Sequence, residues 1–452
     1  MQSTNTRNQV IAAMSSAGGV FALGITLGWP APARSRLLKD DNGYFPINEG
    51  EYDWIASIFT IGCAISCLPI GILMRKFGRK WTMIAMVLPF VVGWSLIAWA
   101  QNLTMLLIGR LLVGLAGGSF AVSSPQYSAE IAEKEIRGVL GSFSGIQFIT
   151  GILFSYIIGA YLSVFWVCII SGLVPVVFGI IFFFMPESPA YLVCKRREEE
   201  AKLALKWLRG RSYDPTEEIE ELTREVDENR KNKVSVAETL KKRSTKRALC
   251  IGFGLKFFQQ GSGISIVLFY ANSIFEAAKT GIDADIQTII SGAVLLVACI
   301  SGTMFVDKIG RKVLLLTSGL LITVTLLTIG IYFRLIENRP ADADNLGWLP
   351  LTALCIFLVG YAVGFGPLPW LLISEVYSKD YNAIASPLNN AFNWMLAFAV
   401  TASFGSITKV FGIGLTFFIF TVLSLIGTFF VEIVVIETKG KSMAEIQRDL
   451  AA

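Results

Sequence analysis

The chain has 452 residues, of which 54% are apolar and 16% are charged, whereas about a quarter of the residues in a soluble globular protein are charged. Its net charge of +5 is too small to indicate a nucleic-acid partner, and the absence of histidine excludes a Ser-His-Asp triad and a histidine metal site. Apolar stretches of about 20 residues match the hydrocarbon thickness that a helix must cross, so we predict an all-α membrane protein.

Twelve apolar runs, taken in chain order, predict twelve transmembrane helices and place both termini on the same side of the membrane. The predicted spans cover residues 10–30, 53–74, 81–99, 103–127, 140–161, 164–186, 247–276, 285–307, 313–333, 350–376, 384–405 and 411–435. No small-residue cleavage site closes the first run, so we expect a retained span there and not a signal peptide.

A long charged stretch at 187–246 separates six spans from six. Its Glu and Lys residues recur at helical spacing, which predicts short solvated helices in a linker. We therefore expect an N-terminal six-helix bundle over 1–186, the linker over 187–246, and a C-terminal six-helix bundle with a short tail over 247–452. Lys and Arg are concentrated in the loops on the linker's side, and this bias predicts that the linker and both termini are cytoplasmic.

Two motifs occur once in each half of the chain. Phe77-Gly78-Arg79-Lys80 after the second span matches Ile309-Gly310-Arg311-Lys312 after the eighth, and the fourth and tenth spans both end in a Pro-to-Glu segment, 125–130 and 369–375. Both pairs are offset by about 240 residues, which indicates duplication of a six-helix unit. Parallel repeats of this kind are the architecture of transporters whose two halves rock around a central site.

Charged residues in and near these motifs predict ion pairs on the cytoplasmic side. The pairing residues are Arg79, Glu130 and Arg137 in the first half, and Asp307, Arg311 and Glu375 in the second. Partial desolvation strengthens such pairs relative to open water, and helix C-termini attract cations. We expect the pairs to close this side when the halves meet and to break when the halves part.

Motifs along the whole chain resemble those of the sugar porters in the major facilitator superfamily. In chain order they are Gly109-Arg110, Pro125-x-Tyr127-x-x-Glu130-Ile131-Ala132, Arg137-Gly138, Pro186-Glu187-Ser188-Pro189, Gln259-Gln260-x-Ser262-Gly263-Ile264, Gly366-Pro367-Leu368-Pro369-Trp370 and Glu437-Thr438-Lys439-Gly440. The short first outer loop and the segment 364–367 are similar to insect facilitated trehalose transporters. The resemblance implies the two-bundle fold of that superfamily, and it adds Arg110 and Glu187 to the residues expected to gate the inner side.

The second half departs from the family pattern at its inner ion pair. Asn382 stands where the partner of Glu375 is normally an arginine. We therefore expect the inner ion pairs of the second half to be weaker than those of the first.

A sugar presents hydroxyl groups and apolar C–H faces, so its site needs neutral amides and aromatic rings. By resemblance, the residues that supply these groups at mid-membrane depth are Gln147, Gln259, Gln260, Trp370, Asn393 and Trp394. The alternative for the amides is hydrogen bonding between helices. The set is also incomplete, because Ser265, Leu295 and Ala397 stand where relatives often have further amides, so the identity of the sugar stays open.

Residues 8–39 contain no Asp or Glu, whereas proton-driven relatives carry a carboxylate in the first span. With no histidine either, no mid-membrane proton carrier is evident, and this favours facilitated diffusion of trehalose or a hexose across the plasma membrane. A proton-coupled symporter and a non-transporting sugar sensor remain the alternatives, whereas no residues are placed for enzyme chemistry. We expect a monomer in the lipid bilayer, with a sugar as its only small-molecule partner and no cofactor or metal.

Lys256 is an isolated cation at the inner part of the seventh predicted span. Its side chain either extends to the cytoplasm or pairs with a carboxylate. The sequence leaves both possibilities open.

Overall fold

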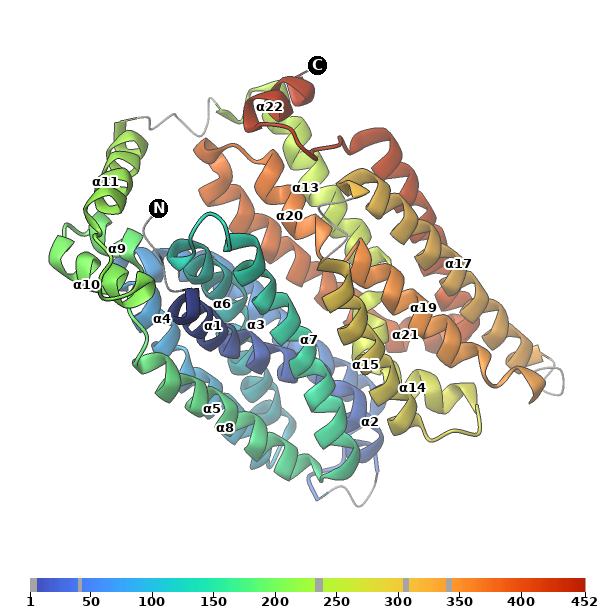
Figure 1. Cartoon of the computed structure of the whole chain (residues 1–452). Helices are drawn as coiled ribbons and strands as arrows, with labels where there is room; N and C mark the ends of the chain where they lie inside the picture. Colours follow the sequence, from blue (N-terminus) through green and yellow to red (C-terminus); the bar gives the residue numbers. More distant parts are fainter. Residues whose placement is uncertain (1–5, 40–42, 232–238, 304–308, 339–343, 452) are drawn as a thin grey trace.

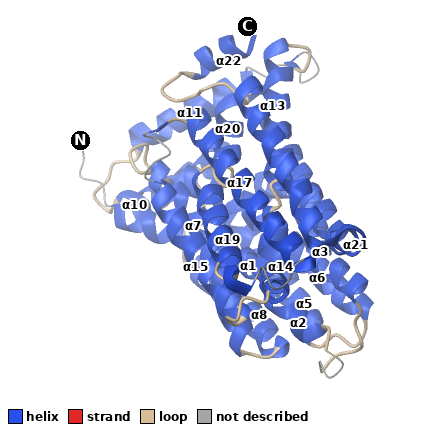
Figure 2. Cartoon of the chain, turned by 90° about the vertical axis from the view of Figure 1, so that its right-hand side faces the viewer, coloured by secondary structure: helices blue, strands red, loops and turns tan. Residues whose placement is uncertain are grey.

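Backbone polar groups have no water to bind inside a membrane, so apolar spans satisfy them as helices. The computed structural model describes residues 6–39, 43–231, 239–303, 309–338 and 344–451, and within these ranges its regular structure is entirely helical (Figures 1 and 2). Within the described ranges, ten helical segments are long and apolar enough to cross a membrane. One of them, Tyr381–Val434, folds back at Gly412, where φ is +80°, and so supplies two spans. With the broken seventh span described below, the fold has the predicted twelve.

The first bundle follows the predicted spans closely. Its helices are α1 (Thr6–Gly28) and α2 (Pro30–Leu37), α3 (Glu49–Phe77), α4 (Arg79–Ala85) and α5 (Val87–Ala98), α6 (Leu103–Ile131), α7 (Arg137–Tyr161) and α8 (Val164–Phe183). The start of α3 is fixed by a capping box, in which the Asn48 side chain accepts from the Glu51 N–H and the Glu51 carboxylate accepts from the Asn48 N–H.

The charged linker forms the predicted short helices, α9 (Pro189–Cys194), α10 (Glu198–Arg209) and α11 (Thr216–Lys231). It is attached to the first bundle through Arg209, whose side chain is 3% exposed. The guanidinium lies 3.3 Å from the Glu133 carboxylate and donates to the Ile131 carbonyl at 2.7 Å and to Glu218 at 2.8 Å. The linker is thus anchored at the C-terminal end of α6.

Two spans of the second bundle are broken at mid-length. Its helices are α13 (Arg243–Gly261) and α14 (Ile264–Ala278), α15 (Ala284–Thr303), α17 (Arg311–Asn338), α19 (Leu349–Val363) and α20 (Leu368–Val376), α21 (Lys379–Val434), and the tail helix α22 (Met443–Ala451), with a short 3₁₀ turn at Asp344–Leu346. Gly263 takes the left-handed conformation between α13 and α14, and the segment 364–367 separates α19 from α20.

The two bundles lie side by side, with α11, α22 and the start of α1 at one end (Figure 1). We call this end the linker end and the opposite end the far end. The polar contacts between the described parts of the two bundles all lie toward the far end. They are Arg34 with Ser273 at 3.3 Å, Arg36 with Asp285 at 3.7 Å, Tyr270 with Asp53 at 2.8 Å, and Tyr156 with the Leu268 carbonyl at 2.7 Å.

Candidate functional site

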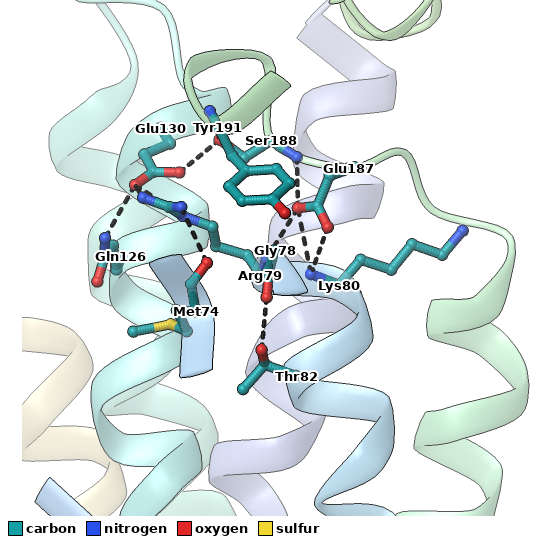
Figure 3. A network of polar contacts seen from close by, with 10 residues as sticks. All are labelled: Met74, Gly78, Arg79, Lys80, Thr82, Gln126, Glu130, Glu187, Ser188 and Tyr191. Carbon is teal, nitrogen blue, oxygen red and sulfur yellow. Dashed lines mark hydrogen bonds and ion pairs between the residues drawn. The ribbon is translucent and has the colours of Figure 1, made fainter. Parts of the chain in front are cut away.

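At the linker end of the first bundle, a cluster of charged side chains joins α3, α4, α6 and the linker (Figure 3). Arg79 donates to one Glu130 carboxylate oxygen from Nε at 3.1 Å and from Nη2 at 2.6 Å. Gln126 donates to the same oxygen at 3.0 Å, and the Ser188 hydroxyl donates to the other. The Arg79 and Glu130 side chains are only 12% and 16% exposed, so this ion pair is largely shielded from water.

Glu187 lies beside this cluster and caps the N-terminus of α4. Its carboxylate accepts from the backbone N–H groups of Arg79 at 3.0 Å and Lys80 at 3.2 Å, where the helix dipole favours an anion. Gly78 precedes α4 with φ at +94°, and a Cβ there would lie 2.2 Å from a Glu187 oxygen, so only glycine fits this turn. Burial raises the pKa of Glu187, although these backbone hydrogen bonds oppose the effect.

The second bundle repeats this arrangement at its own linker end. Arg311 Nη2 donates to Glu375 at 3.1 Å, and the Thr438 hydroxyl donates to the other Glu375 oxygen at 2.5 Å. Glu437 caps α17 by accepting from the N–H groups of Arg311 and Lys312 at 3.1 and 3.0 Å. Burial acts to raise the pKa of Glu437, but its backbone hydrogen bonds outweigh burial and lower it overall.

This match extends the predicted duplication by residues that the sequence analysis did not select for gating. Glu437 corresponds to Glu187, and Thr438 corresponds to Ser188. The sequence signal for this match is a Glu followed by a hydroxyl residue, which occurs directly after both the sixth and the twelfth span.

Two other residues predicted to gate the inner side, Arg137 and Arg110, do not join these clusters. Arg137 is exposed at the start of α7 and makes no ion pair within the described chain. Asp307 lies outside the described residues. Arg110 is fully buried within the first bundle, where it donates to the backbone carbonyls of Ile55 at 2.9 Å and Thr26 at 3.2 Å and lies against two aromatic rings.

The predicted sugar-binding amides of the second bundle form a buried polar cluster. Gln260 Nε2 donates to Asn393 Oδ1 at 3.1 Å, and the Ser265 hydroxyl donates to Gln260 Oε1 at 2.6 Å. This joins the broken seventh span to the eleventh. Trp394, the residue after Asn393, packs edge-on against Phe59 of the first bundle with ring centroids 6.4 Å apart. The residue that follows Asn393 therefore lies at a contact between the bundles, and the cluster lies beside it.

The Gln259 side chain hydrogen-bonds to the backbone at the break in the tenth span. Its Nε2 donates to the carbonyls of Phe365 at 2.6 Å and Gly366 at 3.0 Å, and it lies 3.3 Å from the Tyr361 hydroxyl. These carbonyls lack helical partners because α19 ends at Val363. Both amide hydrogens of Gln259 are thus engaged, as the interhelical alternative anticipated. Tyr361 was not selected from the sequence.

Lys256 neither extends to the cytoplasm nor pairs with a carboxylate of the described chain. It is fully buried, donates to Gln259 Oε1 at 3.1 Å, and lies 3.1 Å from the centroid of the Trp370 ring. Trp370 itself is 40% exposed. The sixth predicted residue, Gln147, is half-buried on α7 of the first bundle and makes no side-chain hydrogen bond within the described residues.

Toward the far end, Tyr270 of α14 contacts the first bundle. Its hydroxyl donates to Asp53 at 2.8 Å and lies 3.2 Å from the Thr401 carbonyl, at a kink where φ of Tyr270 is −119°. Asp53 is 8% exposed and was not selected from the sequence, because nothing local marks it as an interface residue.

Comparisons with known proteins agree on one family. The model described as "Sugar (and other) transporter" matches residues 18–450. The facilitated trehalose transporter Tret1 of Polypedilum vanderplanki is 35% identical over 98% of this chain and 88% of its own length. Tret1 of Anopheles gambiae is 34% identical, and this chain covers 56% of its length. The chain covers 52% of the length of Tret1 from Drosophila erecta.

Solved structures give the same fold. A partially occluded inward open conformation of the xylose transporter XylE from E. coli aligns with 96% of this chain and 99% of its own, with a TM-score of 0.78 and 23% identity. The proton:xylose symporter XylE bound to 6-bromo-6-deoxy-D-glucose aligns with 98% of each chain, with a TM-score of 0.75.

Proposed function

Since this chain belongs to the sugar transporter family of the major facilitator superfamily, we propose that it carries trehalose or a hexose across the plasma membrane by facilitated diffusion. The relatives named Tret1 are facilitated trehalose transporters, and this supports trehalose as the first substrate to test. The linker and both termini face the cytoplasm in this proposal, as the distribution of Lys and Arg favours.

The buried cluster of Gln260, Asn393 and Ser265 carries the proposal. Amides offer donors and acceptors together, which suits the hydroxyl groups of a sugar, and the neighbouring Trp394 ring suits its C–H face. The cluster carries no charge and lies beside the Trp394 contact between the bundles, which supports a neutral ligand there. Gln147, Gln259 and Trp370 complete the proposed set, with Gln259 acting as an acceptor because its hydrogens are engaged.

Transport follows from rocking of the bundles about this cluster. The far-end contacts, which include the hydrogen bond from Tyr270 to Asp53, hold the two bundles together at that end. If the linker end is cytoplasmic, this arrangement faces inward. The outward-facing form requires these contacts to break and the linker ends of the two bundles to approach each other. Arg79–Glu130 and Arg311–Glu375 each lie within one bundle, so in this proposal they stay formed when the linker ends part, contrary to the expectation from the sequence.

Proton symport is the second candidate, and Asp53 is the observation that favours it. It is a buried carboxylate at the bundle contact and touches the closing residue Tyr270, and such a group can couple protonation to conformation. The first span nevertheless has no carboxylate in residues 8–39. Uptake that is insensitive to a protonophore supports facilitated diffusion, and uphill accumulation supports symport.

The direct test is uptake of radiolabelled trehalose and glucose by cells that express Gln260→Ala. We expect this variant to lose transport while its surface expression stays intact, because Asn393 and Ser265 lose their shared partner. Gln101→Ala, an exposed glutamine in a loop, is the matched control and keeps wild-type uptake. Unchanged uptake by Gln260→Ala would contradict the proposed site, and sugar binding without any transport by the wild type would indicate a sensor.

A further inference from the structure

Lys256 is a buried cation between two residues of the proposed sugar site. Its ammonium group donates to Gln259 Oε1 at 3.1 Å, and it lies 3.1 Å from the centroid of the Trp370 ring. Its side chain has no exposed surface, and no carboxylate of the described residues forms an ion pair with it.

Such a placement costs stability. An ammonium removed from water needs a counter-charge or several hydrogen bonds, and one amide oxygen and one indole ring compensate only in part. A methionine of similar length would fill the same space without this cost. A lysine kept at this cost in stability is expected to contribute to something other than stability.

The two contacts show what that contribution is. The charge-assisted bond to Oε1 fixes which way the Gln259 amide points, so that its Nε2 faces the carbonyls of Phe365 and Gly366 in the break of the tenth span. The cation–π contact holds one face of the Trp370 indole, and Trp370 remains 40% exposed. One ammonium group thus links the seventh span, the break in the tenth span and the exposed indole.

We propose that Lys256 is a positioning residue, which fixes Gln259 and Trp370 in the geometry that binds sugar at the expense of protein stability. This inference rests on the proposed function. Lys256 is sealed behind the two side chains that it orients, so its effect on a sugar passes through them.

The test compares Lys256→Met and Lys256→Arg in the full chain, with Lys246→Met as the control on an exposed lysine of the same helix. Sugar uptake gives KM and kcat, and thermal unfolding of the purified protein gives Tm. For Lys256→Met we expect KM to rise about tenfold, kcat to stay within about twofold, and Tm to rise by a few degrees. Lys256→Arg, which keeps the charge, recovers most of the KM, and Lys246→Met changes none of these quantities.

Two results would overturn the proposal. An unchanged KM in Lys256→Met shows that the ammonium does not position the site, whatever happens to Tm. A raised KM accompanied by a lower Tm shows that the lysine supports the fold and not the site geometry. Failure of the proposed function is recognised separately, because the wild-type protein would then take up neither trehalose nor glucose.

Discussion

At the scale of single residues, three charges buried within the bundles are held by neutral partners. Arg110 donates to backbone carbonyls and lies against aromatic rings, Lys256 binds an amide and an indole, and Asp53 accepts from a tyrosine hydroxyl. These arrangements depend on helices that are distant in sequence. The composition and spacing of the sequence mark such a charge as unusual, but they do not identify its partner.

Gly78 provides the sharpest prediction at this scale, because its backbone and its surroundings both require glycine. Gly78→Ala places a side chain at φ of +94° and within 2.2 Å of a Glu187 oxygen. We expect it to cost roughly 2 kcal/mol or more in free energy of unfolding, measured as a lower Tm of the purified protein. Gly141→Ala is the control, since a Cβ there meets no atom within 4 Å. An equal Tm for the two variants would refute the proposed turn.

At the scale of helices, the apolar runs and their length predicted where spans begin and end but not where they break. The predicted span at 103–127 corresponds to α6 (Leu103–Ile131), because a long apolar run flanked by loops leaves little choice. The tenth span was predicted as continuous over 350–376, yet it divides into α19 and α20. The break persists because Gln259, from another span, satisfies the carbonyls of Phe365 and Gly366, and that contact is tertiary.

The candidate site was predictable to a similar extent. The family resemblance predicted Gln260 and Asn393 as site residues, and a hydrogen bond joins them in the structure. The partners Ser265 and Tyr361 were not selected as site residues, because their roles arise from the kink of the seventh span and the break of the tenth. Residues that act through a neighbour leave little trace in a single sequence.

The two equivalent charge clusters differ in geometry, and we predict from this that they differ in strength. The shortest distance between the Arg79 and Glu130 side chains is 2.6 Å, whereas the shortest distance between Arg311 and Glu375 is 3.1 Å, and Asn382 stands where an arginine is expected. We expect Glu130→Gln to lower the free energy of unfolding by roughly 2 kcal/mol and Glu375→Gln by less, judged by Tm.

Glu221→Gln is the control for this pair, because the Glu221–Lys134 ion pair is exposed and contributes little to stability. A loss for Glu375→Gln that equals or exceeds the loss for Glu130→Gln would contradict the expected asymmetry of the two bundles.

At the scale of the whole molecule, two bundles with matching linker-end clusters are held together near the far end (Figure 1). The linker is anchored to the first bundle through Arg209, so it can follow that bundle as a unit. The uncharged cluster at Gln260 lies beside the Trp394 contact between the bundles. These features are the ones that the proposed carrier, which exposes one neutral site to either side in turn, requires.

The most direct measurement is sugar movement through the purified protein reconstituted in liposomes, with trehalose and glucose tested in parallel. We predict that the transported sugar reaches equal concentrations inside and outside, and that an imposed proton gradient leaves this end point unchanged. Accumulation above the outside concentration in response to the proton gradient, or a protein that moves neither sugar, would contradict facilitated diffusion by this chain.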